Sequence, residues 1–160
     1  MQENTGDICI VHFFFVILRA EWVESLTLNF TINKQLTYFI IMEKPYVLGL
    51  DMGGTNSVLG IVDARGHVLA RTSIKTQAYA KIEDYVNARH EEAMKIIEPL
   101  GGIEMFRGIG AGAPNGNFYT GNIEFAPNLP WKDVVPFSKL MSEKFGIPCR
   151  ITNDANAAAM

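Results

Sequence analysis

Apolar and polar positions change their spacing along this chain, and the changes mark out elements of secondary structure. Three short apolar or alternating runs, separated by glycine-containing turns, predict an antiparallel meander of three strands at residues 46–50, 57–63 and 68–76. Residues 82–100 then place apolar side chains at spacings of three and four, with charged side chains between them. This period predicts an amphipathic helix, which a proline and two glycines near residue 100 bring to an end.

After this helix the pattern alternates between strand and helix. Residues 106–113 predict a fourth strand, and a loop rich in Asn, Gly and Pro continues from there to Trp131. Residues 135–145 predict a short helix and residues 149–152 a fifth strand. The Ala-rich residues 154–160 predict the beginning of a third helix. The order β-β-β-α-β-α-β-α predicts an α/β fold in which helices pack against a mixed sheet.

The first 41 residues do not share this pattern. They contain an apolar run at residues 8–18 and a Thr/Asn-rich stretch, with a single glycine and no proline. The run is shorter than the roughly 20 residues that a membrane span needs, and no basic residue precedes it, so we expect neither a span nor a secretion signal. We expect residues 1–41 to be an extension outside the fold, with Met42 as the working initiator and 42–160 as the folded unit.

Composition narrows the classes of function. The formal net charge is −3, and no cluster of Lys or Arg marks a surface for DNA or RNA. The two cysteines, Cys9 and Cys149, have no second Cys or His at metal-ligand spacing, so we expect neither a zinc site nor a disulfide framework in these residues. Isolated thiols suit a reducing compartment, and we expect a cytoplasmic protein.

Residues 51–56 (DMGGTN) form a glycine turn after the first strand and are the sharpest chemical signal. Glycines at positions 53 and 54 allow backbone N–H groups to approach phosphate oxygens, and Thr55 adds a hydroxyl donor. Asp51, at the end of the strand, can hold a hydrated Mg²⁺ ion. A plain hairpin turn is the alternative, because Gly-Gly is common there. The context of three strands favours the phosphate site.

Two further groups of polar residues follow. Asp154, where the fifth strand meets the last helix, can act as a general base toward a substrate hydroxyl, although Asn153 and Asp154 also suit a helix N-cap, which the residues alone favour. The loop at 114–131 concentrates amides and a carboxylate, which suit a hydroxyl-rich ligand. A surface loop with turn-forming asparagines is an equally good interpretation. The side chains concerned are Asn115, Asn117, Asn122, Glu124 and Asn128.

Taken together, four motifs resemble the ROK (repressor, open reading frame, kinase) family of sugar kinases and regulators. They are LGLDMGGTNSVLGIVD at 48–63, GIGAGAPNG at 108–116, FAPNLPW at 125–131 and ITNDANAAAM at 151–160. The resemblance implies the actin-like ATPase (ribonuclease H-like, hexokinase-type) fold, in which two lobes close over a cleft. It also implies that this chain holds only the N-terminal lobe. In the family the second lobe carries a Glu-x-Gly-His sugar motif, usually a cysteine-rich structural zinc motif, a second phosphate loop and the adenosine pocket.

The resemblance also implies roles for individual residues. Contacts with the phosphates of ATP are implied for Asp51, Gly53, Gly54, Thr55 and Asn56, with Mg²⁺ held through water at Asp51. Sugar contacts are implied for Gly112, Ala113, Pro114, Asn128, Asn153 and Asp154. Asp154 is further implied to be the catalytic base that takes the proton from the 6-hydroxyl of the sugar.

The implied activity is ATP-dependent phosphorylation of a hexose, with glucose as the first candidate substrate. The resemblance also makes a homo-oligomer one expectation for the complete kinase. N-acetylhexosamines, mannose, fructose and allose remain as other substrates. A sugar-sensing regulator is the alternative, but residues 1–41 show no pair of helices for a helix-turn-helix. Because the second lobe completes the cleft, we expect these 160 residues alone to be inactive.

Overall fold

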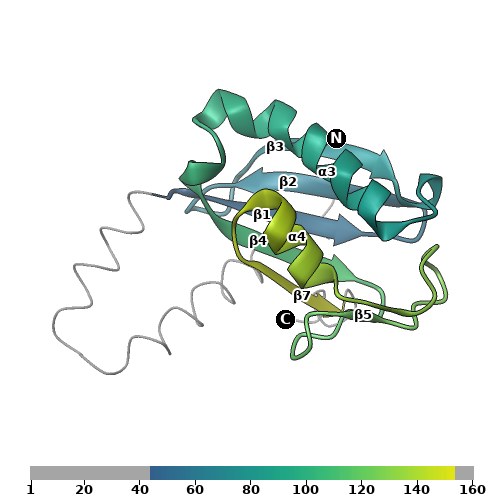
Figure 1. The fold of residues 1–160 in the computed structure, drawn as a ribbon. Helices are drawn as coiled ribbons and strands as arrows, with labels where there is room; N and C mark the ends of the chain where they lie inside the picture. The colour runs from purple at the N-terminus through teal and green to yellow at the C-terminus, as the bar shows by residue number, and fades with distance from the viewer. Residues whose placement is uncertain (1–43, 154–160) are drawn as a thin grey trace, which may run out of the picture.

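The computed structural model describes residues 44–153 (Figure 1). The extension expected at 1–41 and the helix expected at 154–160 lie outside these residues. The division of the chain near Met42 therefore stays a prediction.

A five-stranded mixed sheet with the strand order β3-β2-β1-β4-β7 forms the centre of the fold (Figure 1). The predicted meander is confirmed, because β1 (Tyr46–Met52), β2 (Asn56–Val62) and β3 (Val68–Lys75) pair in antiparallel fashion. On its other side, β1 pairs in parallel with β4 (Phe106–Ala113), and β4 pairs in parallel with β7 (Cys149–Asn153).

The first turn is shorter than the sequence suggested. Residues 51–56 were expected to be a turn, but Asp51 and Met52 continue β1 and pair with Val58 and Ser57 of β2. Only residues 53–55 connect the two strands. The reason is that an antiparallel ladder continues up to its turn, and the two glycines make a tight turn possible.

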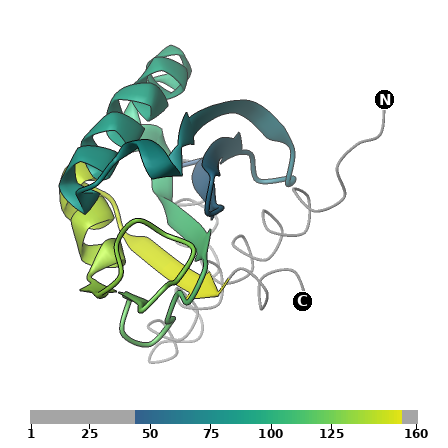
Figure 2. The ribbon, with the colours of Figure 1, turned by 90° about the vertical axis from the view of Figure 1, so that its right-hand side faces the viewer.

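Two helices cover one side of the sheet (Figure 2). They are α3 (Ile82–Ile97), which lies over the meander, and α4 (Phe137–Phe145), which packs beside it and against β7. The 3₁₀ turns η2 (Glu98–Leu100) and η3 (Ile103–Met105) lead from α3 into β4. Gly101, with φ of 100°, ends the helical run as the sequence predicted.

The core lies between this side of the sheet and the helices. Apart from the adjacent pair Tyr85 and Val86, the buried residues of α3 follow one another at spacings of three and four, which confirms the predicted buried face. They are Tyr85, Val86, Arg89, Ala93 and Ile97. The apolar residues among them pack with fully buried apolar side chains of the sheet and of α4, including Leu48, Leu50, Leu59, Ile109, Phe106 and Phe137.

The long loop between β4 and α4 contains a small ladder that the sequence did not reveal. Its strands, β5 (Ile123–Glu124) and β6 (Val134–Val135), have two residues each, too few to show alternation. Buried Ile123 and Trp131 fix the loop to the core, and the ring of Trp131 meets Tyr85 edge-on with 5.0 Å between centroids.

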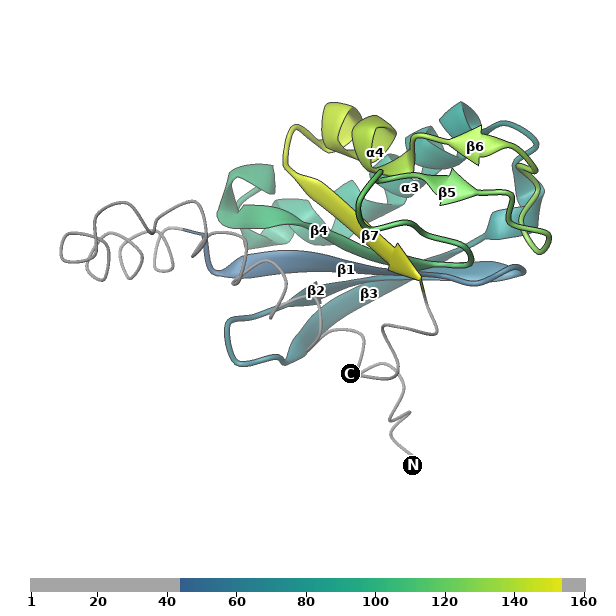
Figure 3. The same cartoon turned by 90° about the horizontal axis from the view of Figure 1, so that it is seen from below.

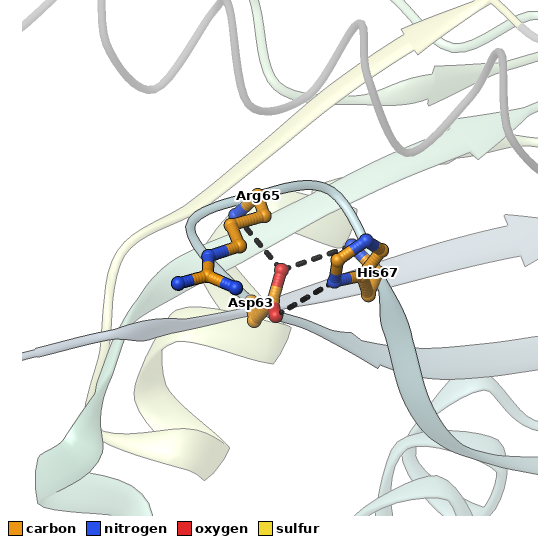
Figure 4. Close-up of polar contacts among 3 residues, drawn as sticks. All are labelled: Asp63, Arg65 and His67. Atoms are coloured by element: carbon orange, nitrogen blue, oxygen red, sulfur yellow. Dashed lines mark hydrogen bonds and ion pairs between the residues drawn. The ribbon is translucent and has the colours of Figure 1, made fainter.

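The turn between β2 and β3 is held by one carboxylate (Figure 4). Oδ1 of Asp63 accepts the backbone N–H groups of Arg65 at 2.8 Å and His67 at 2.9 Å. Its Oδ2 lies 3.2 Å from Nδ1 of His67. Partial burial raises the pKa of Asp63, but the hydrogen bonds from His67 and Arg65 outweigh it, and the pKa is lowered overall.

Candidate functional site

The carboxyl ends of the parallel strands β1, β4 and β7 meet at one edge of the sheet (Figure 3). Asp51 pairs with Gly112, and one residue further along, Ala113 pairs with Asn153. Adjacent strands are about 4.8 Å apart, so the candidate residues on these strands are neighbours. The fold thus brings together residues that are about 100 positions apart in sequence.

The predicted phosphate motif makes a tight turn at this edge. The N–H of Gly53 donates to the carbonyl of Asn56 at 3.0 Å, and a Cβ at position 53 would lie 2.8 Å from that oxygen. Glycine is therefore required at the first position of the turn. Asp51 is half-buried at the end of β1, while Thr55 and Asn56 are exposed. A carboxylate beside such a turn is a suitable ligand for a hydrated Mg²⁺ ion.

The backbone polarity of the turn suits an anion. The segment after β3 donates hydrogen bonds to the carbonyl groups of all three residues of the turn. Thr76 Oγ1 donates to the Gly53 carbonyl at 2.8 Å, and the Thr76 N–H donates to the Thr55 carbonyl at 2.9 Å. Gln77 Nε2 donates to the Gly54 carbonyl at 2.7 Å. Within residues 44–153 the N–H groups of Gly54 and Thr55 have no acceptor. Two amide donors are thus available for phosphate oxygens, while the carbonyls that would repel them are engaged.

The long loop passes directly over this turn at Asn128. A Cβ at Gly54 would lie 3.0 Å from the carbonyl oxygen of Asn128 and 3.3 Å from its Cβ. Gln77 Nε2, already bonded to Gly54, also donates to the Asn128 carbonyl at 3.0 Å. Asn128, the predicted sugar contact, therefore lies next to the predicted phosphate turn. Asn128 is exposed.

Other polar residues of the loop bond mainly with one another. The amide of Asn115 donates to the carbonyl of Glu124 at 3.0 Å, and the amide of Asn117 lies 3.2 Å from the Glu124 carboxylate. Thr120 Oγ1 donates to the same carboxylate at 2.8 Å. For Asn115, Asn117 and Glu124 these contacts favour the loop-forming interpretation over ligand binding.

Gly116 is a site position to which the sequence assigned no role. A Cβ there would lie 2.4 Å from the carbonyl oxygen of Thr152, so the loop rests directly on the end of β7. Asn153, half-buried, is the next residue of that strand. The signal was present as a glycine immediately after Pro114 and Asn115, but a close approach between distant segments cannot be read from composition.

A buried arginine that bonds to β2 was also missed. Arg89 of α3 is fully buried, and its Nη2 donates to the carbonyl of Ser57 at 2.9 Å and to its hydroxyl at 3.0 Å. The Tyr85 hydroxyl donates to Ser57 Oγ at 2.9 Å. Burial lowers the pKa of Arg89, and interactions with Tyr85 raise it in part. The sequence could have indicated a buried charge here, because Arg89 lies four positions after Tyr85 and four before Ala93, on the apolar face of the helix.

The rest of the expected site is described only in part. Asp154, the expected base, follows Asn153 and lies outside the described residues. Across residues 44–153, no three or more His, Cys, Asp or Glu side chains are grouped so that they could hold a metal ion. Over the same residues, the helices are too short or too polar to cross a bilayer.

Solved structures of sugar kinases share this architecture. A ROK family glucokinase from Streptomyces griseus, in complex with glucose and AMPPNP, matches with a TM-score of 0.61 and 30% identity over 71% of this chain and 35% of that chain. The ROK hexokinase from Thermus thermophilus matches with a TM-score of 0.58 and 30% identity over 69% of this chain and 36% of its own. The fold is that of the N-terminal part of an actin-like ATPase, as the sequence predicted.

The ROK family matches residues 47–160, and the chain belongs to this family. Glucokinase from Streptomyces coelicolor is 30% identical over 112 residues, which are 70% of this chain and 33% of the relative. A relative from Caldicellulosiruptor sp. is named as a candidate xylose repressor. It is 30% identical over 118 residues, which are 71% of this chain and 29% of the relative.

A glucomannokinase from Segatella bryantii is 84% identical over 19 residues, which are 12% of this chain and 76% of the relative. The chain spans about a third of the length of the Streptomyces glucokinase that it matches. The matched relatives thus include glucokinases and a candidate repressor, so membership of the family does not by itself assign an activity to the whole protein.

Proposed function

We propose that this chain supplies the N-terminal lobe of an ATP-dependent hexose kinase, with glucose as its first candidate substrate. The observation that carries the proposal is the meeting of two sites at one sheet edge. A turn with two available amide donors lies in contact with Asn128, and Asn153 ends a nearby strand. A phosphate site beside a polar, hydroxyl-binding site is what transfer of a phosphoryl group from ATP to a sugar requires.

In this proposal the phosphates of ATP bind over the turn at 53–55 and over Asn56, the first residue of β2. The N–H groups of Gly54 and Thr55 donate to phosphate oxygens, and the Thr55 hydroxyl, which is exposed, adds a third donor. A Mg²⁺ ion, held through water by Asp51, would offset the negative charge of the phosphates. The carbonyl groups of the turn, engaged by Thr76 and Gln77, present no negative end to the ligand.

The sugar would bind along the ends of β4 and β7. Gly112 and Ala113, which are buried, and Pro114, which is half-buried, would border the sugar there. Asn128 and Asn153 would provide amide groups that can both donate and accept. Asp154 follows Asn153 directly, and we assign it the role of the base that takes the proton from the 6-hydroxyl. Closure of a second lobe would exclude water before the transfer.

A sugar-sensing regulator is the second candidate, because one relative is named as a candidate xylose repressor. A regulator needs the sugar site but gains nothing from a phosphate turn. The intact turn, with its two glycines and its engaged carbonyls, therefore favours the kinase. The short, highly similar stretch shared with a glucomannokinase makes mannose a substrate to test beside glucose. We place the kinase in the cytoplasm, where ATP is available.

The test is a coupled assay on the complete purified protein with ATP and a panel of sugars: glucose, mannose, fructose, allose and N-acetylhexosamines. We expect phosphorylation of glucose, and we expect Asp154→Asn to lower kcat by about 10²–10⁴-fold while sugar binding is retained. Asp84→Asn, which changes an exposed carboxylate on α3, is the matched control and should keep normal turnover.

Two results would count against the proposal. Sugar binding without turnover of any hexose by the complete wild-type protein would favour the regulator. Normal turnover by Asp154→Asn would leave Asp154 with a helix-capping role only.

A further inference from the structure

Gln77 joins the two halves of the candidate site. It lies in the 3₁₀ turn η1 (Thr76–Ala78) that follows β3, 23 residues from Gly54 and 51 residues from Asn128. Its Nε2 donates to the Gly54 carbonyl at 2.7 Å and to the Asn128 carbonyl at 3.0 Å. Both partners are acceptors only, so the amide must present its nitrogen to them.

The two carbonyls belong to segments that also touch directly. Because Gly54 has no side chain, the backbone of Asn128 can approach within the space that a Cβ would occupy. Thr76 holds the turn through the Gly53 and Thr55 carbonyls, but within residues 44–153 it makes no hydrogen bond to the loop. Gln77 is thus the residue through which the segment after β3 holds both the turn and the loop.

We propose that Gln77 is a positioning residue that makes nucleotide and sugar bind cooperatively. This inference rests on the proposed function. A nucleotide that orders the turn also fixes the Gly54 carbonyl, and through Gln77 it orders the loop that carries Asn128. A sugar that then binds beside Asn128 meets a loop that is already ordered, and its affinity rises.

The size of the effect follows from the nature of the link. Gln77 is exposed, so water competes for its two hydrogen bonds, and a coupling near the low end of the usual range is expected. We expect the complete protein to bind glucose about 5–10-fold more tightly with AMPPNP than without it. Linkage requires that glucose raise the affinity for AMPPNP by the same factor, which provides an internal check.

The test is calorimetric titration of the complete protein with glucose, in the presence and absence of saturating AMPPNP. Gln77→Met keeps the length of the side chain and removes both donors, and it should bring the ratio of the two glucose affinities to within about twofold of one. Asn87→Ala, which removes an exposed amide from α3, is the control and should keep the wild-type ratio. Thermal melting of both variants checks that the fold is intact.

The outcomes separate this inference from the proposed function. If the wild-type protein binds both ligands but its ratio is one, or if Gln77→Met keeps the wild-type ratio, the coupling role is wrong and the kinase proposal stands. If the wild-type protein binds neither glucose nor AMPPNP, the proposed function fails and the coupling fails with it. A ratio that falls in Gln77→Met and persists in Asn87→Ala supports the inference.

Discussion

Substitution of Gly116 by alanine should disturb the site without touching a candidate ligand-binding side chain. The new methyl group would lie 2.4 Å from the carbonyl oxygen of Thr152, 2.9 Å from its carbonyl carbon and 3.0 Å from Cγ1 of Ile151. Ordinary contacts begin at 3.4 Å, so about 1 Å of space is missing. Two of the three neighbours are backbone atoms, which cannot rotate away.

The strain must be relieved by movement of the loop or of the end of β7. Movement of the loop would shift the segment that leads to Asn128. Movement of the end of β7 would shift Asn153. Overpacking of this kind costs about 1–3 kcal/mol of stability. A displacement of about 1 Å can cost up to about 10²-fold in rate, so we expect kcat/KM for glucose to fall by about 10–100-fold.

The assay compares kcat/KM and the Tm of the complete protein for wild type, Gly116→Ala and a control. Gly60→Ala is a suitable control, because its Cβ would meet its nearest neighbours at 3.6 and 3.7 Å. There the loss of backbone freedom in the unfolded chain should stabilise the protein by about 0.4–1 kcal/mol. If Gly116→Ala keeps both the wild-type Tm and the wild-type kcat/KM, the close packing of the loop on β7 is not what positions the site.

Three further outcomes follow from the buried and hydrogen-bonded groups. Arg89→Met should lower the free energy of unfolding in urea titration by about 1–3 kcal/mol, because the carbonyl and hydroxyl of Ser57 lose a charged donor. An unchanged midpoint of the urea unfolding transition would contradict this. The pKa of Asp63 is lowered in the folded state, so its charge stabilises the fold above the unfolded pKa of about 3.9 and this contribution is lost as pH falls through the folded value. The Tm difference between wild type and Asp63→Asn should therefore be constant above about pH 5 and shrink below about pH 4, whereas a constant difference down to pH 2.5 would refute the role of the charge. Burial raises the pKa of Cys149 to about 12, so peptide mapping after iodoacetamide treatment at pH 8 should find this thiol unmodified until the protein is unfolded, and rapid labelling of the native protein would contradict its burial.

The sequence predicted the elements of this fold better than it predicted the contacts between them. The five main strands and the two helices follow from local periods, since each period reflects which face of the element is buried. The C-terminal end of β1 was misjudged, because whether Asp51 belongs to a strand or a turn depends on its partner Val58. The β5–β6 ladder has too few residues to show a period.

For the candidate site, the sequence indicated the chemical groups and not the framework that holds them. The glycines at 53 and 54 and the polar Asn128 were identified from motifs, and the structure places Gly54 in contact with Asn128. Their roles in binding stay predictions. Gln77 could not be found this way, because its partners are 23 and 51 residues distant and a glutamine in a short turn has no distinctive pattern.

The strand order also has a consequence for how the chain acquires its structure. The meander of β1, β2 and β3 is made of contacts between sequence neighbours, and Thr76 and Gln77 reach the turn from within the same segment. Such local contacts close quickly, whereas β4 and β7 can join the sheet only after α3 and α4 have crossed back over it. The predicted phosphate turn thus lies in the part of the sheet that can form first. The edge assigned to the sugar depends on long-range pairings and is completed last.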